Sequence, residues 1–410
     1  MDELKTTYID ESFLGNPLKT LILSRETQRM LLCVTFSIAI GIMAWDSFLS
    51  VAIFLPVVWV KAPTKMTAWL IGLGYHLAAS RGLIFGIPVF FGSTVFYGIA
   101  LWLMAGLIQS LPYFFCSYVR NPYLAIVLLF FALTLPPVGI VGWANPLTAA
   151  GVIFPGTGFA GLFLSLCLIW LIVWLHDKGK AFVGIWVMLI VLLPLVIGPT
   201  ATVTIQIKGS TTNFTGNPSN LGDKFKRDYQ KFIKTYNQYS GSAFKTLVLP
   251  ETTAGIWFES TKQLWARWQR DLKPDQSIIL SALLPENKGS LKTYNALIEM
   301  KKDNFKVLYK ARQSVPVAMW RPWANDDVKI NWFDCPVFDV AWKKATALIC
   351  YEAYLTWPVL QSFLSGDPEI ILFVSNHWWS KDTSLLSIQK TCVNAWARLF
   401  NAQLISAVNS

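Results

Sequence analysis

The stretch STVFYGIALWLMAGLIQSLPYFFC, residues 93–116, decides the class of this protein because it contains no charged side chain. An apolar helix of about 20 residues crosses the hydrocarbon core of a bilayer, so this stretch is typical of a membrane-spanning helix. The same criterion predicts seven spans, near residues 30–45, 48–60, 67–90, 93–116, 122–143, 157–176 and 181–199; the second is short and interrupted by Pro56. Residues 30–200 are therefore predicted to form a polytopic helical membrane domain.

The composition of the chain agrees with this interpretation. Of its 410 residues, 54% are hydrophobic and 14% charged, and the mean hydropathy is +0.44. The absence of any carboxylate between Asp46 and Asp177 excludes an ordinary water-facing surface over that stretch. The net charge of +11 is explained by loops beside lipid head groups. The second half shows no motif that combines aromatic and basic residues, so direct nucleic-acid binding is not expected.

The loop charges predict how the chain is oriented. Lysine and arginine precede the first span and follow the second, fourth and sixth, whereas the loops after the third and fifth spans are uncharged. The basic residues of these loops are Lys5, Lys19, Arg25, Arg29, Lys61, Lys65, Arg120, Lys178 and Lys180. Because basic loops stay on the cytoplasmic side, the pattern predicts a cytoplasmic segment over residues 1–29 and places everything after residue 200 on the other side.

One charged residue, Arg81 in AASRG, does not fit these loops. A charge at that depth usually faces a protein interior or a water-filled cavity. Alternatively, the third span consists of two shorter pieces and Arg81 sits at an interface between them. The sequence leaves both interpretations open.

Residues 201–410 alternate strand and helix patterns. Apolar runs predict strands at 201–207, 245–251, 277–285, 305–311, 345–352, 369–376 and 402–408, and amphipathic runs predict helices at 221–239, near 259–270, after residue 352 and near 385–401. Strands separated by helices of this kind indicate a layered α/β domain.

Three polar residues stand where predicted strands end: Glu251 in VLPETT, Lys310 in VLYKAR and Cys350 in LICYEAY. The carboxyl ends of strands collect functional groups in α/β folds. A thiolate could attack an acyl group, a carboxylate could carry the protons, and an ammonium could stabilise the oxyanion. Each residue alone is more often structural, as a buried thiol or a solvated strand cap.

The remaining cysteines and histidines give no sign of a metal centre. Six cysteines and three histidines match no zinc spacing, so neither a metal nor a cofactor is expected. The predicted topology would permit a disulfide between Cys335 and Cys392 in an oxidising compartment, and the sequence leaves that pairing open.

The order PE, YK, CYE and SNxxW resembles the nitrilase (carbon–nitrogen hydrolase) superfamily. With spans in front, the chain resembles apolipoprotein N-acyltransferases in WLIGLGYHLAASRG, NPLTAAGVIFPGTGFAGL, VLPET, ICYE and VSNHWW. It is more similar still to the plasmid conjugal-transfer branch, which shares RQxVPVxMWxPW, here Arg312 to Trp323. The resemblance implies an αββα sandwich and a catalytic triad of Glu251, Lys310 and Cys350.

The departures from the pattern concern the same site. Lys310 stands six residues before Pro316, whereas the catalytic lysine of the family stands five before it, so Arg312 is an alternative cation. Met319 occupies the position of the glutamate that assists catalysis in the family. The other residues that the resemblance assigns to a supporting role are Glu352, Asn376, His377 and Trp379, where His377 replaces a carboxylate. The domain is also expected to be truncated, because the last strands of the pattern are missing.

Two functions follow from this resemblance. One is a membrane-bound thiol acyltransferase or amidase that works through a Cys350 thioester on a phospholipid or a lipidated protein. The other is a catalytically decayed scaffold or maturation component of a conjugation apparatus. Either would sit in a bacterial inner membrane with residues 201–410 in the periplasm. No GxxxxGK[ST] phosphate loop occurs, so the chain is not the ATPase that drives transfer.

Overall fold

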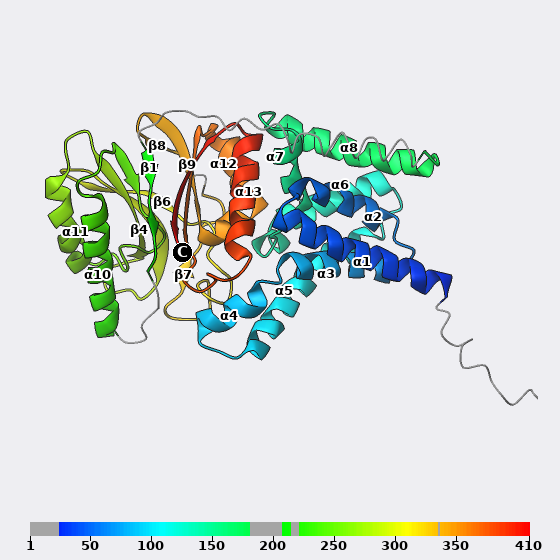
Figure 1. Ribbon diagram of the computed structural model, residues 1–410, viewed down its shortest axis with the longest axis horizontal. Helices are drawn as coiled ribbons and strands as arrows, with labels where there is room; N and C mark the ends of the chain where they lie inside the picture. Colours follow the sequence, from blue (N-terminus) through cyan, green and yellow to red (C-terminus); the bar gives the residue numbers. More distant parts are fainter. Residues whose placement is uncertain (1–23, 181–206, 215–220, 335–336) are drawn as a thin grey trace, which may run out of the picture.

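The computed structural model describes residues 24–180, 207–214, 221–334 and 337–410. Figure 1 shows a helical region built from the first half of the chain beside an α/β region built from the second. The predicted span at 181–199, nearly all of the predicted strand at 201–207, most of segment 1–29 and Cys335 lie outside the described residues.

The helical region contains the apolar helices that the sequence predicts. Within the described residues, α1 (Arg25–Asp46), α5 (Val95–Cys116) and α8 (Phe159–Asp177) are long and apolar enough to cross a membrane. A fourth span is obtained if α3 (Lys65–Ala79) and α4 (Leu83–Phe91), bent by 59° at their junction, count as one. The prediction of several apolar membrane helices is thus confirmed for this part of the chain.

Two predicted spans are short apolar helices; the second was predicted to be short, whereas the fifth was not. The second consists of η3 (Leu49–Phe54) and α2 (Leu55–Val60), and the fifth of α6 (Pro122–Thr134), about 20 Å long. Leu135 is extended and precedes Pro136 and Pro137, which have no N–H to continue a helix. The prediction of one helix through residue 143 was therefore wrong; η4 (Val138–Ile140), η5 (Pro146–Ala149) and α7 (Ala150–Ile153) follow instead.

Arg81 lies at the break between α3 and α4. Its guanidinium pairs with Asp46 at the end of α1 and also donates to the Ala78 carbonyl at 3.1 Å. The third predicted span is thus two pieces, and Arg81 ties their junction to a neighbouring helix.

The basic loops meet at one end of the helical region. The Lys61 ammonium pairs with Asp177, and the Lys65 ammonium donates to the Ser117 carbonyl at 3.2 Å and lies 3.7 Å from the centroid of the Tyr118 ring. The end of α8 and the start of α1 both point away from the α/β region (Figure 1).

The α/β region contains two mixed sheets. The first has the order β1 (Ile207–Gly209), β3 (Thr246–Val248), β4 (Ser277–Pro285), β5 (Thr293–Met300) and β6 (Phe305–Lys310), with β7 (Val328–Lys329) beside β5. The second has the order β2 (Thr211–Thr212), β11 (Gln403–Asn409), β10 (Ile370–Asn376), β9 (Lys343–Ile349) and β8 (Phe338–Val340). In the first sheet β1, β3 and β4 pair in parallel, β4, β5 and β6 pair antiparallel, and β7 is parallel to β5. In the second sheet all pairs are parallel except β9 with β8.

The strands pack in four layers because their apolar side chains alternate. Val248, Ile279 and Leu297 belong to the core between the sheets, whereas Leu247 and Ile278 pack under α10 (Leu221–Tyr239) and α11 (Glu259–Asp271). On the outside of the second sheet lie α12 (Thr356–Gly366) and α13 (Leu385–Leu399). This arrangement confirms the predicted layered α/β domain, although β5 was not among the predicted strands.

The two regions pack tightly against each other. The short helix η7 (Cys350–Tyr354) follows β9, and its Tyr351 hydroxyl donates to the Ile140 carbonyl at 2.9 Å. Close by, α7 approaches α13 so closely that a Cβ atom on Gly151 would lie 1.9 Å from the Ala395 carbonyl oxygen. Glycine is needed at residue 151 for this backbone contact.

We predict that Gly151→Ala destabilises the protein by about 1–3 kcal/mol, because both backbones must separate to admit the methyl group. Thermal unfolding of the full chain in detergent measures the effect. Gly241→Ala is the matched control, since a Cβ atom there meets nothing within 4 Å. Equal melting temperatures for the two variants would contradict the observed packing.

Candidate functional site

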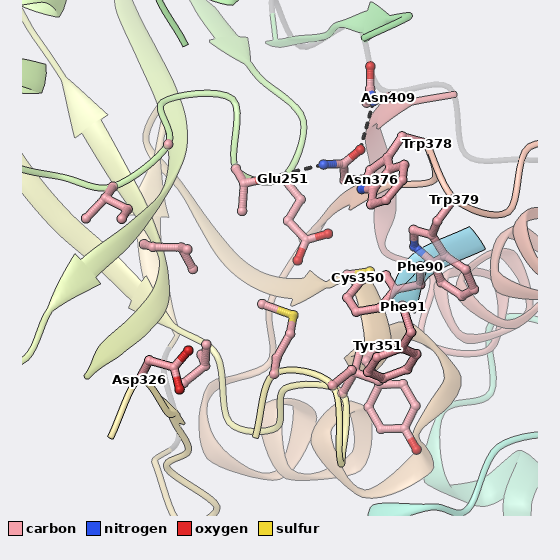
Figure 2. Close-up of a pocket in the computed structure, with 18 of the residues that line it drawn as sticks. Phe90, Phe91, Glu251, Asp326, Cys350, Tyr351, Asn376, Trp378, Trp379 and Asn409 are labelled. Atoms are coloured by element: carbon pink, nitrogen blue, oxygen red, sulfur yellow. Dashed lines mark hydrogen bonds between the residues drawn. The ribbon is translucent and has the colours of Figure 1, made fainter. Parts of the chain in front are cut away.

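A cavity of about 810 Å³ lies where the α/β region meets α4 and α5. Its walls include apolar side chains of both helices: Leu83, Ile87, Phe90, Phe91, Leu101, Met104 and Ile108. Figure 2 shows Glu251, Cys350 and Asn376 around this space, with Phe90, Trp378 and Trp379 beside them. Its volume is in the range typical of small-molecule sites.

Cys350 stands where β9 ends and η7 begins. Its φ of 48° is left-handed, a conformation that a non-glycine residue adopts only when its surroundings impose it. Thr252 (φ 52°) and Val317 (φ 65°) line the same cavity. Such backbone strain gathers around functional sites.

Glu251 is buried and faces Cys350. Its carboxylate accepts a hydrogen bond from the Asn295 side chain at 2.7 Å and shares another with the Cys350 thiol. Burial raises the pKa of Glu251 to about 7, although both hydrogen bonds act against this rise. Burial and then the Glu251 charge raise the pKa of the Cys350 thiol well above its usual value. Near neutral pH the thiol therefore keeps its proton, and Glu251 can accept it.

Asn376, at the end of β10, adds hydrogen-bond donors. Its backbone N–H favours the charged forms of both Glu251 and Cys350. Its side chain donates to the Thr252 hydroxyl at 3.2 Å and accepts from the Asn409 amide at 2.8 Å. A buried N–H beside a nucleophile is the kind of donor that stabilises an oxyanion.

Lys310 does not join Glu251 and Cys350. On β6, Tyr309 pairs with Leu297 of β5 and faces the core between the sheets, so the next residue, Lys310, faces outward. Its ammonium lies 4.2 Å from the centroid of the Tyr294 ring, and it is not among the residues that line the cavity.

Arg312, the alternative cation, and Glu352 form a fully buried ion pair away from the cavity lining. Glu352 accepts hydrogen bonds from the backbone N–H groups of Ile349 (2.8 Å) and Arg312 (2.7 Å) and from the Tyr309 hydroxyl (2.7 Å). Glu352 thereby fixes the turn that carries Cys350, and the Arg312 guanidinium neutralises the charge of Glu352.

His377 acts on Cys350 through a glutamine. The amide of Gln389 donates to the Cys350 carbonyl at 2.5 Å, and its Oε1 lies 2.6 Å from His377 Nε2. His377 Nδ1 is 2.6 Å from the Ser380 hydroxyl. Burial lowers the pKa of His377 to about 4, so the ring is neutral at pH 7. This geometry fits Nε2–H as the donor to Gln389.

Trp379 lines the cavity directly. Its ring centroid lies 5.7 Å from that of Phe90 on α4, and it packs on Gly86, where a Cβ atom would approach the indole to 2.7 Å. Met319, which takes the place of the assisting glutamate of the family pattern, is also a lining residue.

Lys231 on α10 lines the cavity and was not among the residues singled out from the sequence. The pattern YQKFIKTYNQY indicates a helix but not which lysine turns inward. Asn295 and Gln389 were likewise not predicted as members of the site, because their roles depend on contacts across the fold.

Comparison with known proteins gives the family. No family model matches the chain. Probable conjugal transfer protein TraB of Sinorhizobium fredii is 33% identical over 392 residues, which cover 91% of this chain and 96% of that protein. Conjugal transfer protein TraB of Agrobacterium fabrum is 29% identical over 415 residues, 95% of this chain and 94% of that protein.

Among solved structures, a glutamine-dependent NAD+ synthetase from Acinetobacter baumannii is similar at a TM-score of 0.31 and 16% identity, over 42% of this chain and 32% of that chain. So low a score supports no conclusion about fold or function. The two sequence relatives extend over both the helical and the α/β regions. The chain therefore belongs to the family of the conjugal transfer protein TraB.

Proposed function

We propose that this protein is a membrane-bound thiol acyltransferase or amidase with a membrane domain at residues 30–200 and a catalytic domain at residues 201–410. The observation that carries the proposal is the buried pair of Glu251 and Cys350 in a cavity whose walls include α4 and α5. The order of Glu251 and Cys350 along the chain also fits the nitrilase-like pattern of the sequence.

The cavity walls favour a lipid as the acyl donor. Leu83, Ile87 and Phe90 of α4 line its apolar side, and outward-facing side chains of α4 and α5 are exposed, with 65% of Phe85 and 82% of Phe96 accessible. Exposed apolar side chains on long apolar helices are typical of lipid contact. An acyl chain could therefore pass from the bilayer to Cys350 along these helices.

The reaction has two balanced halves. In the first, Glu251 takes the thiol proton, the Cys350 sulfur bonds to the acyl carbonyl carbon, and the ester C–O bond breaks as Glu251 returns the proton to the leaving alcohol. In the second, an amine or water attacks the thioester, gives its proton to Glu251, and the C–S bond breaks as sulfur regains it. The Asn376 N–H would donate to the oxyanion of each tetrahedral intermediate.

We propose that the catalytic domain lies on the periplasmic side of a bacterial inner membrane. The support is the gathering of Lys61, Lys65 and the end of α8 at the side of the helical region away from the α/β region. Basic loops stay in the cytoplasm. Membership of the TraB family supports a role in conjugal transfer, and we propose a protein of the conjugation apparatus as the acceptor.

A catalytically decayed scaffold is the second candidate. The observations that favour it are the outward position of Lys310 and the presence of Met319 in place of a carboxylate. In that case Cys350→Ala would support conjugation as well as the wild type does.

Incubation with vesicles of phosphatidylethanolamine and phosphatidylglycerol should add an acyl mass to the Cys350 peptide of the purified full chain. Glu251→Gln should slow the addition by about 10²–10⁴-fold because the proton acceptor is lost. Mass spectrometry measures the adduct, and Lys310→Met serves as the control with wild-type acylation. An unmodified Cys350 peptide in the wild type would overturn the enzyme proposal.

Acylation should also depend on pH through Glu251. The pKa of this carboxyl is raised to about 7, so it is protonated and unable to act as a base below that value. The rate should rise through about pH 7 and fall about tenfold per unit below pH 6. Single-turnover rates between pH 5 and 9 test this; a profile that is flat from pH 5 to 8 would contradict the role of Glu251.

Orientation can be measured with Lys288→Cys in the α/β region and Arg120→Cys at the far end of α5. Both native residues are exposed. A membrane-impermeant maleimide should label Lys288→Cys in cells with a permeabilised outer membrane, and Arg120→Cys only after lysis. The unsubstituted chain gives the background, and the reverse pattern would place the catalytic domain in the cytoplasm.

A further inference from the structure

Neither of the two cations expected from the sequence lines the cavity of Glu251 and Cys350. Lys310 faces Tyr294 on the outside of the first sheet, and Arg312 is paired with Glu352 in the core. We propose that Lys231 is the cation of this site, a positioning residue whose ammonium holds Glu251 in place and favours its charged, proton-accepting form. This inference rests on the proposed function of the Glu251–Cys350 pair.

Lys231 reaches the site from α10. Only 8% of its side chain is exposed, and it lines the same cavity as Glu251 and Cys350. An ammonium is rarely buried this far unless it is paired or hydrogen-bonded. Its Nζ donates to the Thr252 carbonyl at 3.3 Å, directly after Glu251 in the chain.

Thr252 is held from three sides. Lys231 binds its carbonyl, the Ser281 hydroxyl accepts its N–H at 3.0 Å, and the Asn376 amide donates to its hydroxyl at 3.2 Å. These contacts come from α10, β4 and β10, and they hold a residue with a left-handed φ of 52°. Lys231 therefore fixes the turn that carries Glu251.

The charges around Lys231 are mixed. Arg227 and Asp228 on its own helix and Glu251 across the cavity act on it, and its Nζ lies 4.0 Å from the Asp228 carboxylate. Lys224, Arg321 and Asp326 also line the cavity. Burial and then the Arg227 charge lower the pKa of Lys231 to about 8, while Asp228 and Glu251 act in the opposite direction. The ammonium is therefore mostly protonated at pH 7.

A positive charge that lines the same cavity as Glu251 and binds the carbonyl of the next residue favours the charged form of the Glu251 carboxyl. Loss of the Lys231 charge should thus raise the pH at which the Glu251–Cys350 pair loses its first proton.

The experiment measures the rate at which iodoacetamide alkylates Cys350 in the full chain, between pH 6 and 10, by mass spectrometry of the Cys350 peptide. Lys231→Gln, which keeps a donor for Thr252 but carries no charge, and Lys231→Met are compared with the wild type. Lys231→Arg keeps the charge, and Lys310→Met removes a lysine outside the cavity. Melting temperatures are recorded for every variant.

The midpoint of the alkylation profile should rise by about one pH unit in Lys231→Gln and Lys231→Met, and stay at the wild-type value in Lys231→Arg and Lys310→Met. An unchanged midpoint in Lys231→Gln would overturn the inference, even if its melting temperature falls. Alkylation of Cys350 requires no acyl donor. If the wild type accepts no acyl group from lipid, the proposed function is wrong, but the alkylation profiles still test the role of Lys231.

Discussion

The carboxylate of Glu352, which has no exposed surface, holds the turn on which the candidate site is built. A buried charge is tolerated only when its hydrogen bonds and a counterion replace the lost water. Glu352 receives them from Ile349, from Tyr309 and from the backbone and side chain of Arg312. These groups join the end of β9 to the segment after β6, and so connect the two sheets beside the turn that carries Cys350.

This anchor accounts for the strained backbone at Cys350. A left-handed φ at a non-glycine residue costs of order 1–3 kcal/mol and persists only where the surroundings determine it. Glu352 fixes the N–H of Ile349 on one side, and Gln389, itself held by the neutral ring of His377, fixes the Cys350 carbonyl on the other. The sulfur is thereby directed toward Glu251. His377 thus belongs to the support of the nucleophile.

Much of this arrangement could be predicted from the sequence. Strand-end position together with the family resemblance named Glu251 and Cys350, and the structure joins their side chains by a hydrogen bond across the two sheets. Lys310 was expected beside them, but its ammonium lies against the Tyr294 ring, because the adjacent Tyr309 pairs with the inward-facing Leu297 and Lys310 therefore faces the other side of the sheet. Lys231 was missed for a different reason. The helix that carries it is amphipathic and rich in lysine, and the sequence does not show which of these lysines binds the Thr252 carbonyl and is buried.

The helical half is part of the candidate site as well as its anchor. Gly86 allows Trp379 to pack on α4, and Gly151 allows α7 to meet α13 at backbone distance. These contacts place apolar helix walls around a cavity that also contains a buried carboxyl, a thiol and an ammonium. In such surroundings little water competes, so each charge depends on its neighbours. Asn295 and Asn376 donate hydrogen bonds that favour the charged form of Glu251, and Lys231 binds the turn that follows it, so the chemistry of Cys350 depends on residues of β5, β10 and α10.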